Sequence, residues 1–338
     1  MNTIAFFNNK GGVGKTSLVY HLAYMYAELG LKVVAADLDP QANLTSMFLD
    51  DERLEEVWPD GEHSDTILAA LQPIMTGVGD IGEPHVEAIN DNIGLVVADL
   101  GLSSFEDSLS DVWAKCLDSD EAAFRSMSSL ARIISAAGRG FGAELALIDV
   151  GPNLGAINRA ALIAAHYVAV PLAPDLYSLQ GLRNLGPTLR RWRGEWKRRL
   201  ERNPASELEL PGGEMEPIGY IIVQHAVRSD RPTRAYGRWM IRIPGEYRES
   251  VLGSKPEVFT DQPQDDANCL AMLKHYRSLV PMATEAHKPM FALKPADGAI
   301  GAHVYAAQQC LEDFNKLAVS IAERCEIDLP RSKARFPL

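Results

Sequence analysis

The first seventeen residues contain the feature that most constrains the fold of this chain. An apolar run, Thr3–Asn8, leads directly into Asn9-Lys10-Gly11-Gly12-Val13-Gly14-Lys15-Thr16-Ser17, and a helical pattern of apolar residues follows. This order of strand, glycine-rich loop and helix is the context that a phosphate-binding P-loop requires. The glycines let backbone N–H groups converge on phosphate oxygens, and the helix adds the positive end of its dipole.

Each residue type in this loop has an expected task. Lys15 is expected to neutralise the β- and γ-phosphates, and the Thr16 hydroxyl is expected to ligate Mg²⁺. The alternative, a glycine-rich turn with a surface lysine, does not explain why the motif, its position and its flanks all agree. The predicted ATP-binding residues are Lys10, Gly11, Gly12, Val13, Gly14, Lys15, Thr16 and Ser17.

Short β-rich runs alternate with helical patterns along the rest of the chain, which is the rhythm of a parallel sheet flanked by helices. The predicted strands are Thr3–Asn8, Lys32–Asp37, Gly94–Ala98, Leu145–Val150, Tyr167–Leu172 and Ile218–Gln224. The predicted helices are Ser17–Leu29, Phe124–Ala137, Ser178–Arg202, which we expect to kink or break near Pro187, and Ile300–Arg324. The predicted fold class is therefore α/β, a mostly parallel sheet flanked by helices, of the P-loop NTPase type.

We expect one ATPase domain over residues 1–330 and a C-terminal tail at 331–338. The net charge of −12 is unevenly spread, because residues 50–125 hold 19 acidic and 3 basic residues. That segment is interpreted as an acidic, solvated insertion. With 46% apolar and 23% charged residues the chain is not disordered, and it has no apolar stretch long enough to span a membrane. No signal peptide is apparent, so we expect a cytoplasmic protein.

The box KGGVGKTS carries a second lysine, Lys10, and in this it resembles the deviant Walker A box of the ParA/MinD family of ATPases. The resemblance is closest to ParA proper, because Asp-Pro-Gln follows the second predicted strand at residues 39–41. Other segments that resemble the family are residues 33–43 (its DxDPQxN segment), 145–149 (its Walker B strand), 170–182 (its next strand and helix) and 281–305 (the loop that feeds its last helix).

The resemblance implies roles for individual residues. The residue that matches Lys10 reaches across a dimer interface to the partner's phosphates, so the nucleotide is sandwiched and association depends on ATP. Asp39 matches the carboxylate placed near the attacking water, and Lys10, Lys15 and Asp39 form the predicted catalytic set. Asp149, at the end of a buried strand, is expected to reach the metal through water, with Asp37 as a further candidate metal ligand.

Structural alternatives stay open for these carboxylates. Asp37 and Asp39 could be strand-end acids that cap the next helix through Asn43 and Thr45, and Asp149 could be a structural cap. The chain also departs from the family pattern in two ways. The family usually has a second proline or a similar small residue after the Walker B aspartate, whereas the run here is Asp149-Val150-Gly151-Pro152-Asn153. In addition, 110 residues separate Asp39 from Asp149, which is longer than typical.

Residues 183–202 form the most basic block of the chain, with eight basic and two acidic residues. Leucines and tryptophans recur there at three- and four-residue spacing and predict one buried stripe that includes Trp192 and Trp196. The complementary surface is predicted to bind DNA phosphates without reading sequence, the alternative being a solvated basic helix. The candidate DNA-binding residues are Arg190, Arg191, Lys197 and Arg198, and a second basic group follows at Arg228, Arg231, Arg234, Arg238 and Arg242.

The predicted function is that of an ATPase which dimerises with ATP, binds nonspecific DNA and positions or segregates plasmid, chromosome or protein cargo. ATP and Mg²⁺ are the expected cofactors, a ParB-like or other partner is expected to stimulate hydrolysis, and the protein is expected to associate with the nucleoid. Base-contacting residues do not carry over clearly, although Gln224 and His225 lie at a suitable strand end.

Two alternative functions stay open. A MinD-like surface regulator needs a C-terminal amphipathic helix, but residues 326–338 contain Pro330 and Pro337 and no apolar face, so no stable membrane anchor is expected. A small-molecule ATP-dependent ligase of the same superfamily gains nothing from the basic block. Iron–sulfur relatives are disfavoured because the four cysteines form no CxxC pair.

Overall fold

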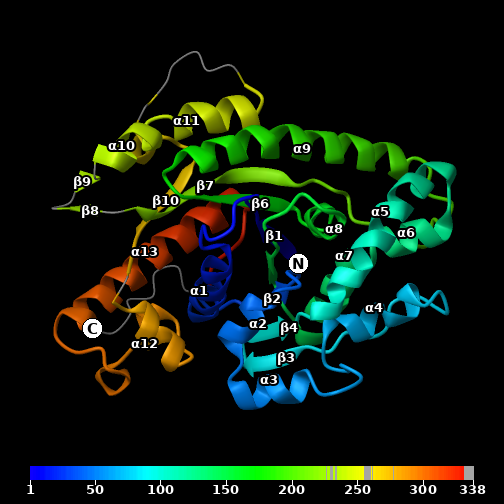
Figure 1. The fold of residues 1–338 in the computed structure, drawn as a ribbon, viewed down its shortest axis with the longest axis horizontal. Helices are drawn as coiled ribbons and strands as arrows, with labels where there is room; N and C mark the ends of the chain where they lie inside the picture. Colours follow the sequence, from blue (N-terminus) through cyan, green and yellow to red (C-terminus); the bar gives the residue numbers. More distant parts are fainter. Residues whose placement is uncertain are drawn as a thin grey trace.

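An eight-stranded sheet crosses the molecule in this computed structural model in the order β10-β7-β6-β1-β5-β2-β4-β3. In Figure 1, α9 runs above β7 and β6. Every neighbouring pair is parallel except β3 with β4, which is antiparallel. This confirms the predicted α/β class. The strands of the sheet are β1 (Asn2–Phe6), β2 (Val33–Asp37), β3 (Glu87–Asn90), β4 (Ile93–Val96), β5 (Leu145–Asp149), β6 (Tyr167–Leu172), β7 (Glu216–His225) and β10 (Cys269–Lys274), and a separate two-stranded ribbon is formed by β8 (Val227–Arg228) and β9 (Arg231–Pro232).

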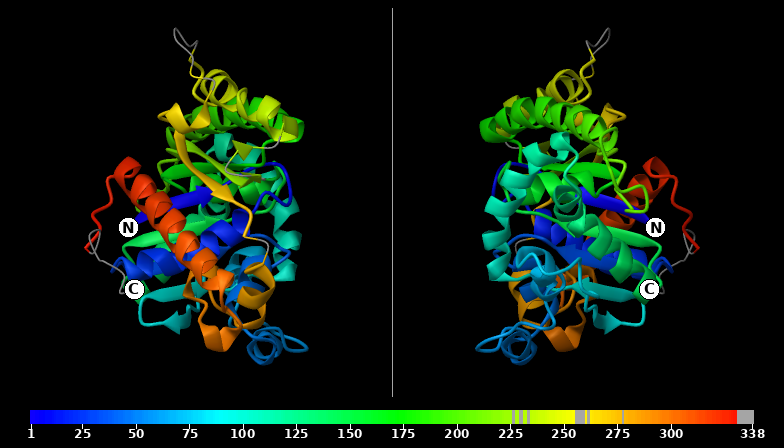
Figure 2. Two further views of the ribbon diagram at one scale, coloured as in Figure 1. Left: turned by 90° about the vertical axis from the view of Figure 1, so that its left-hand side faces the viewer. Right: turned by 90° about the vertical axis from the view of Figure 1, so that its right-hand side faces the viewer.

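Helices cover both faces of the sheet, with α13 on one side and α7 on the other in the side views of Figure 2. The helices that precede β5 are α1 (Lys15–Glu28), α2 (Asn43–Phe48), α3 (Asp51–Val57), α4 (Ile67–Met75), α5 (Phe105–Lys115), α6 (Glu121–Met127) and α7 (Ser129–Phe141). Those that follow β5 are α8 (Ala156–Ile163), α9 (Leu176–Leu200), α10 (Arg234–Met240), α11 (Ile243–Glu246), α12 (Val280–Glu285) and α13 (Ala302–Arg324).

The central strands are buried on both faces, because successive side chains point to opposite sides of a strand. Ile4 and Phe6 of β1 join the core formed with α1 and α13, whereas Ala5 joins the core formed with α7, α8 and α9. All three side chains are fully buried. The P-loop that follows β1 is therefore anchored in the best-packed part of the sheet.

The structure describes the whole chain except residues 226, 229–230, 233, 255–259, 261, 277 and 331–338. The predicted tail at 331–338 lies outside the described residues. The side chains of Gln224, His225, Arg228, Arg231 and Arg234 are also outside them. Within the described ranges, no helix combines the length and the apolar character needed to cross a bilayer.

Several elements differ from the sequence-based predictions. The helix predicted over 124–137 is divided into α6 and α7 at Ser128, where the Ser128 hydroxyl donates to the Phe124 carbonyl at 2.8 Å. Serine side chains compete in this way with helical hydrogen bonds. The predicted kink or break near Pro187 is wrong in part, because α9 is one continuous helix with Pro187 inside it. Strands β3 and β10 were not predicted.

The acidic segment 50–125 is more closely integrated into the fold than a solvated insertion would be. It supplies β4, which pairs with β2, and its side chains Phe105 and Phe124 are fully buried. Several of its acids are paired internally, since Arg53 bridges Glu56, Asp65 and Glu87. Only part of its negative charge therefore faces solvent.

Candidate functional site

The P-loop wraps one end of an open cavity of about 510 Å³ at the carboxyl ends of the strands. Gly12 and Gly14 have φ angles of 72° and 81°, a backbone conformation that favours glycine. Helix α1 begins directly afterwards at Lys15, so its first N–H groups border the cavity. The cavity is lined by Gly11, Gly12, Gly14, Lys15, Thr16, Ser17, Asp39, Gln41, Asn43, Met47 and Pro152.

Lys15 is buried at the base of this cavity. Its Nζ donates to the Asn8 carbonyl at 3.3 Å. Burial lowers the pKa of Lys15, while the nearby carboxylates of Asp149 and Asp39 act in the opposite direction. A buried ammonium group with only one neutral acceptor is suited to an incoming anion.

Asp37 and Asp149 lie side by side in register at the ends of β2 and β5. Asp37 accepts hydrogen bonds from the Thr45 amide at 2.8 Å and the Thr45 hydroxyl at 2.9 Å, and its other oxygen accepts from the Asp39 amide at 3.2 Å. Burial raises the pKa of Asp37 to about 7, against the effect of these bonds. Asp37 thus caps α2 through Thr45, as the structural alternative expected, and its role as a metal ligand stays a prediction.

Asp149 differs from Asp37 because both of its carboxylate oxygens are buried and, among the described residues, neither has a hydrogen-bond partner. Burial, followed by the charge of Asp37, raises the pKa of Asp149 to about 8, whereas the adjacent Thr16 hydroxyl and Lys15 lower it. An unpartnered buried carboxylate beside a hydroxyl fits a site for hydrated Mg²⁺, which keeps several waters and takes few protein ligands. No cluster of three or more His, Cys, Asp or Glu in the described part of the chain could hold a metal by itself.

Asp39 is half-buried and lines the cavity opposite the P-loop. Its Oδ1 accepts from the Gln41 amide at 3.1 Å. The loop after β5 lies next to Asp39, because a Cβ atom added to Gly151 would be 3.4 Å from the Asp39 carboxylate. In the same loop, Pro152 would be 3.9 Å from a Cβ atom added to Gly11. Asp39 and Lys15 therefore border one cavity, and the catalytic role of both stays a prediction.

Lys10 points to a neighbour within its own chain. Its Nζ forms an ion pair with Asp175, the residue before α9, and lies 5.9 Å from the centre of the Tyr177 ring. The predicted role of Lys10 across a dimer interface stays a prediction. No sequence signal connected Lys10 with Asp175, because 165 residues separate them.

Two smaller hollows adjoin the first turns of α1, and sequence reasoning missed both. One, of about 80 Å³, lies at the ends of β7 and β10 and shares Gly14 and Ser17 with the P-loop. The strand end at Gln224–His225 is in register with Lys274 of β10, which lines this hollow. Sequence reasoning missed this hollow because it did not predict β10, whose short CLAMLK run lies far along the chain from the predicted strands.

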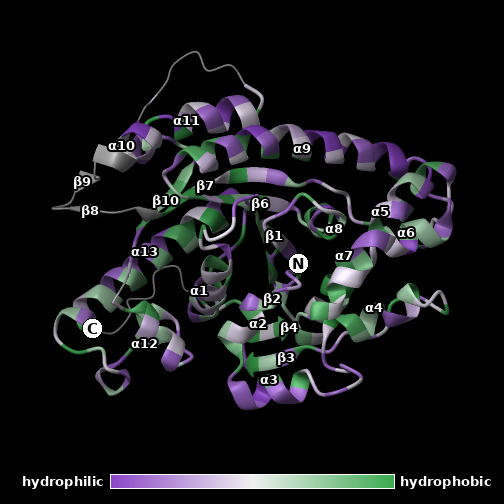
Figure 3. Cartoon of the chain, in the orientation of Figure 1, coloured by the Kyte–Doolittle hydropathy of each residue, from purple (hydrophilic) through white to green (hydrophobic). Residues whose placement is uncertain are grey.

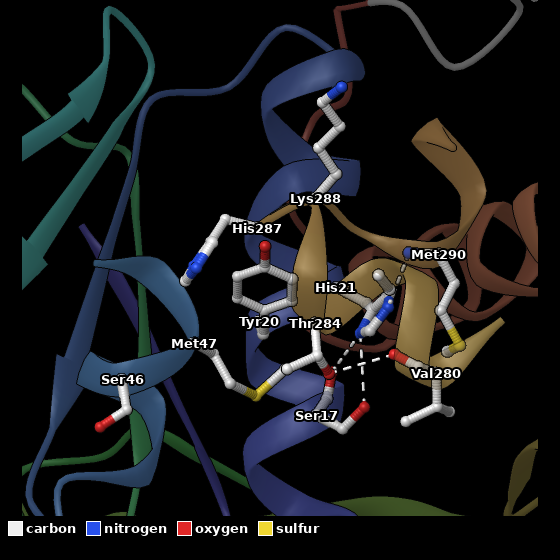
Figure 4. Close-up of a pocket in the computed structure, with 11 residues that line it drawn as sticks. Ser17, Tyr20, His21, Ser46, Met47, Val280, Thr284, His287, Lys288 and Met290 are labelled. Carbon is white, nitrogen blue, oxygen red and sulfur yellow. Dashed lines mark hydrogen bonds between the residues drawn. The ribbon is translucent and has the colours of Figure 1, made fainter. Parts of the chain in front are cut away.

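The second hollow, about 90 Å³ and largely apolar, lies between α1, α2 and α12 (Figure 4). His21 stands at its wall with both ring nitrogens engaged: Nδ1 donates to the Ser17 carbonyl at 2.7 Å, and Nε2 accepts from the Met290 amide at 3.1 Å. Complete burial lowers the pKa of His21 to about 4. The neutral imidazole thus ties the P-loop helix to the C-terminal segment.

The basic block lies on α9 as the periodicity predicted. Trp192 and Trp196 are buried, and hydrophilic residues run along the helix in Figure 3. Arg191, Lys197 and Arg198 are exposed, and in the described structure none has a hydrogen bond or ion pair. Arg190 is exposed as well, but its Nη1 donates to the carbonyls of Ser250 and Val251 at 2.7 and 2.8 Å. DNA binding by all four residues stays a prediction, and the Arg190 guanidinium group is already engaged by these two carbonyls.

Comparison with known families gives one match over most of the chain. The family model AAA_31, described as an AAA domain, matches residues 1–202. Residues 203–338, which contain β7, β10 and α13, lie beyond that match.

Comparison with individual proteins gives relatives in plasmid and chromosome partition. The chain is 33% identical to Protein IncC of Escherichia coli over 189 residues, 56% of this chain and 46% of IncC. It is 28% identical to the chromosome partitioning protein ParA of Caulobacter vibrioides over 202 residues, 60% of this chain and 67% of ParA. The chain thus spans about half the length of IncC.

Among solved structures, the fold is similar to that of a Cyanothece McdA variant in complex with ATP. The TM-score is 0.61 at 14% identity, covering 97% of each chain. The similarity in fold therefore extends beyond residue 202.

Proposed function

We propose a function from the premise that this chain belongs to the AAA_31 family, with ParA-type partitioning ATPases among its relatives. The proposal is that it binds ATP with Mg²⁺, dimerises in the ATP-bound state and hydrolyses the γ-phosphate. The observation that carries it is Asp149, whose buried carboxylate has no partner among the described residues and stands beside Thr16 and Lys15. Such a group is costly unless a ligand completes the site.

The phosphates fit against the N-terminal end of α1. Backbone amides of Gly12 and Gly14 and the Lys15 ammonium group would surround them, and the Thr16 hydroxyl with Asp149, through water, would hold Mg²⁺. When bound, the metal neutralises charge on the β- and γ-phosphates. We propose that the adenine base of ATP occupies the hollow at the ends of β7 and β10, because this hollow adjoins Ser17 on the far side of the P-loop.

Hydrolysis requires a water held in line with the γ-phosphate and added positive charge. Asp39 lines the cavity without holding the P-loop, so we assign it to orienting that water. Lys10 directly precedes Gly11, which lines the cavity, and a second subunit would present its own Lys10 to the bound nucleotide. This arrangement would make dimerisation depend on the γ-phosphate.

The exposed cations of α9 support a DNA-binding role. Arg191, Lys197 and Arg198 are free to contact phosphates, and a dimer would double that surface. The names of the relatives suggest a plasmid, chromosome or protein cargo, a ParB-like activator and association with the nucleoid.

ATP turnover by the purified protein tests the enzymatic part directly. Phosphate release from MgATP, without any added small-molecule substrate, should be slow but measurable, and Lys15→Ala should abolish both turnover and ATP affinity. Lys316→Ala, an exposed lysine on α13, is the matched control and should behave as wild type. Unchanged ATP affinity in Lys15→Ala would contradict the proposed site.

A further inference from the structure

We propose that Glu106 is a positioning residue for ATP hydrolysis, which it serves by fixing the loop that follows Asp149; this inference rests on the proposed ATPase function. Glu106 lies on α5, about fifty residues before the helix that it holds. One of its carboxylate oxygens accepts from the Ala156 amide at 2.5 Å, and the other accepts from the Ile157 amide at 2.8 Å. These are the first two residues of α8.

The local sequence provides no other cap for α8. Its N-cap residue, Gly155, has no side chain to accept a hydrogen bond, so the first N–H groups depend on Glu106. A carboxylate at a helix N-terminus also gains from the helix dipole and from charge-assisted hydrogen bonds. Glu106 therefore performs from a distance the task that a local serine or aspartate usually performs.

Gly155 is what allows the carboxylate to approach. A Cβ atom at residue 155 would lie 2.3 Å from Glu106 Oε1 and 3.0 Å from Asn153 Oδ1. The backbone of Gly155 has φ −79°, which alanine adopts without strain. Alanine at this position would thus displace the Glu106 carboxylate and leave the main chain largely as it is.

The segment held in this way is a wall of the phosphate cavity. A Cβ atom on Gly151 would lie 3.4 Å from the Asp39 carboxylate, and Pro152 lines the cavity together with Gly11 of the P-loop. Asn158 of α8 ties this segment to the helix, because its amide donates to the Gly151 carbonyl at 2.9 Å and to the Asn153 carbonyl at 2.7 Å. A shift of α8 is therefore transmitted to the place where Asp39 would hold water.

The helix that carries Glu106, α5, is itself held by contacts with neighbouring helices. Near its other end, the centre of the Trp113 ring lies 3.7 Å from the Arg199 guanidinium group of α9 and 4.3 Å from that of Arg159 of α8. Arg199 also donates from Nε to the Trp113 carbonyl at 2.8 Å. Because Arg199 belongs to α9, α5 is held from outside α8 as well, and movement of the loop away from Asp39 strains the Glu106 hydrogen bonds.

The test compares Glu106→Gln, Gly155→Ala and the double variant with wild type, with Asp107→Asn as a control because Asp107 is an exposed acid next to Glu106 on α5. Steady-state kinetics should show kcat lowered roughly tenfold or more, while KM for ATP stays close to wild type. The double variant should be no slower than either single variant, because both remove the same contact. Hydrogen exchange at residues 150–157 should rise in all three and not in Asp107→Asn.

The outcomes separate this inference from the function on which it rests. Variants that exchange faster at residues 150–157 or melt earlier, yet hydrolyse ATP with wild-type kcat, would show a purely structural cap and overturn the positioning role. Additive losses in the double variant would also overturn it. A wild-type protein that binds ATP but releases no phosphate would overturn the proposed function and this inference together.

Discussion

Lys10 and Asp175 form an ion pair within one chain, between the start of the P-loop and the residue that precedes α9. The two side chains are 28% and 31% exposed, so the pair is accessible but not free in solvent. The other oxygen of Asp175 accepts from the Ser178 amide at 2.9 Å and caps α9. If Lys10 serves the nucleotide of a second subunit, this ion pair must open before the dimer forms.

Asp175→Asn is therefore expected to strengthen ATP-dependent association. Asparagine retains the cap on α9 but removes the charge that holds Lys10. An ion pair of this exposure is worth ~1 kcal/mol and one must open in each of the two chains, so the dimer dissociation constant should fall about thirtyfold. Analytical ultracentrifugation with a nonhydrolysable ATP analogue measures this. An unchanged constant would show that the ion pair does not compete with association.

Asp39→Ala should separate nucleotide binding from turnover. Asp39 lines the cavity and, among the described residues, its carboxylate accepts only the Gln41 amide, so its loss should leave ATP affinity intact while hydrolysis falls by about 10². Single-turnover phosphate release gives the rate, and Asp51→Ala, an exposed acid on α3, is the control. A rate within about twofold of wild type would remove Asp39 from the mechanism.

The basic face of α9 should bind DNA through charge alone. Arg198→Glu should weaken binding to unrelated duplexes and lower the slope of log affinity against log salt by about 0.9 for each lost contact. Lys316→Glu makes the same charge change on α13 and should have little effect. Mobility shifts at two salt concentrations compare the two variants. Equal retention by both would show that α9 carries only solvated charge.

The stability of the protein should fall in acid because of His21. Its pKa is lowered from 6.5 to about 4 on folding, so the unfolded chain binds the proton first as the pH falls. The stabilisation is complete above pH 6.5 and is lost as the pH falls toward 4, by ~2 kcal/mol between about pH 7 and 4.5. His21→Gln should lose this part of the pH dependence in urea unfolding. Parallel pH profiles for the two proteins would contradict this role.

Local patterns were enough to predict the centre of the fold and of the candidate site. The P-loop, Asp37, Asp39 and Asp149 all lie at the ends of apolar runs, and parallel strands bring such ends to one edge. Strands β3 and β10 escaped prediction because their short runs, EAIN and CLAMLK, show no alternation of apolar and polar residues.

Long-range contacts account for what the sequence did not predict. The ion pair of Lys10 and the cap formed by Glu106 join residues 165 and about fifty positions apart, and neither has a local signature. The continuity of α9 through Pro187 also depends on packing. Gly186 lies so close to the Ser250 carbonyl that a Cβ atom would be 1.9 Å from it, so this part of the helix is shaped by the segment packed across it.

The central claim is that ATP, and not ADP, brings two chains together through Lys10. Light scattering of the wild type and of Lys10→Ala, each with MgADP and with a nonhydrolysable MgATP analogue, tests it most directly. The account predicts that the mass of the wild type doubles only with the ATP analogue and that Lys10→Ala stays monomeric in both nucleotides. A wild-type mass that is the same in both nucleotide states would contradict it.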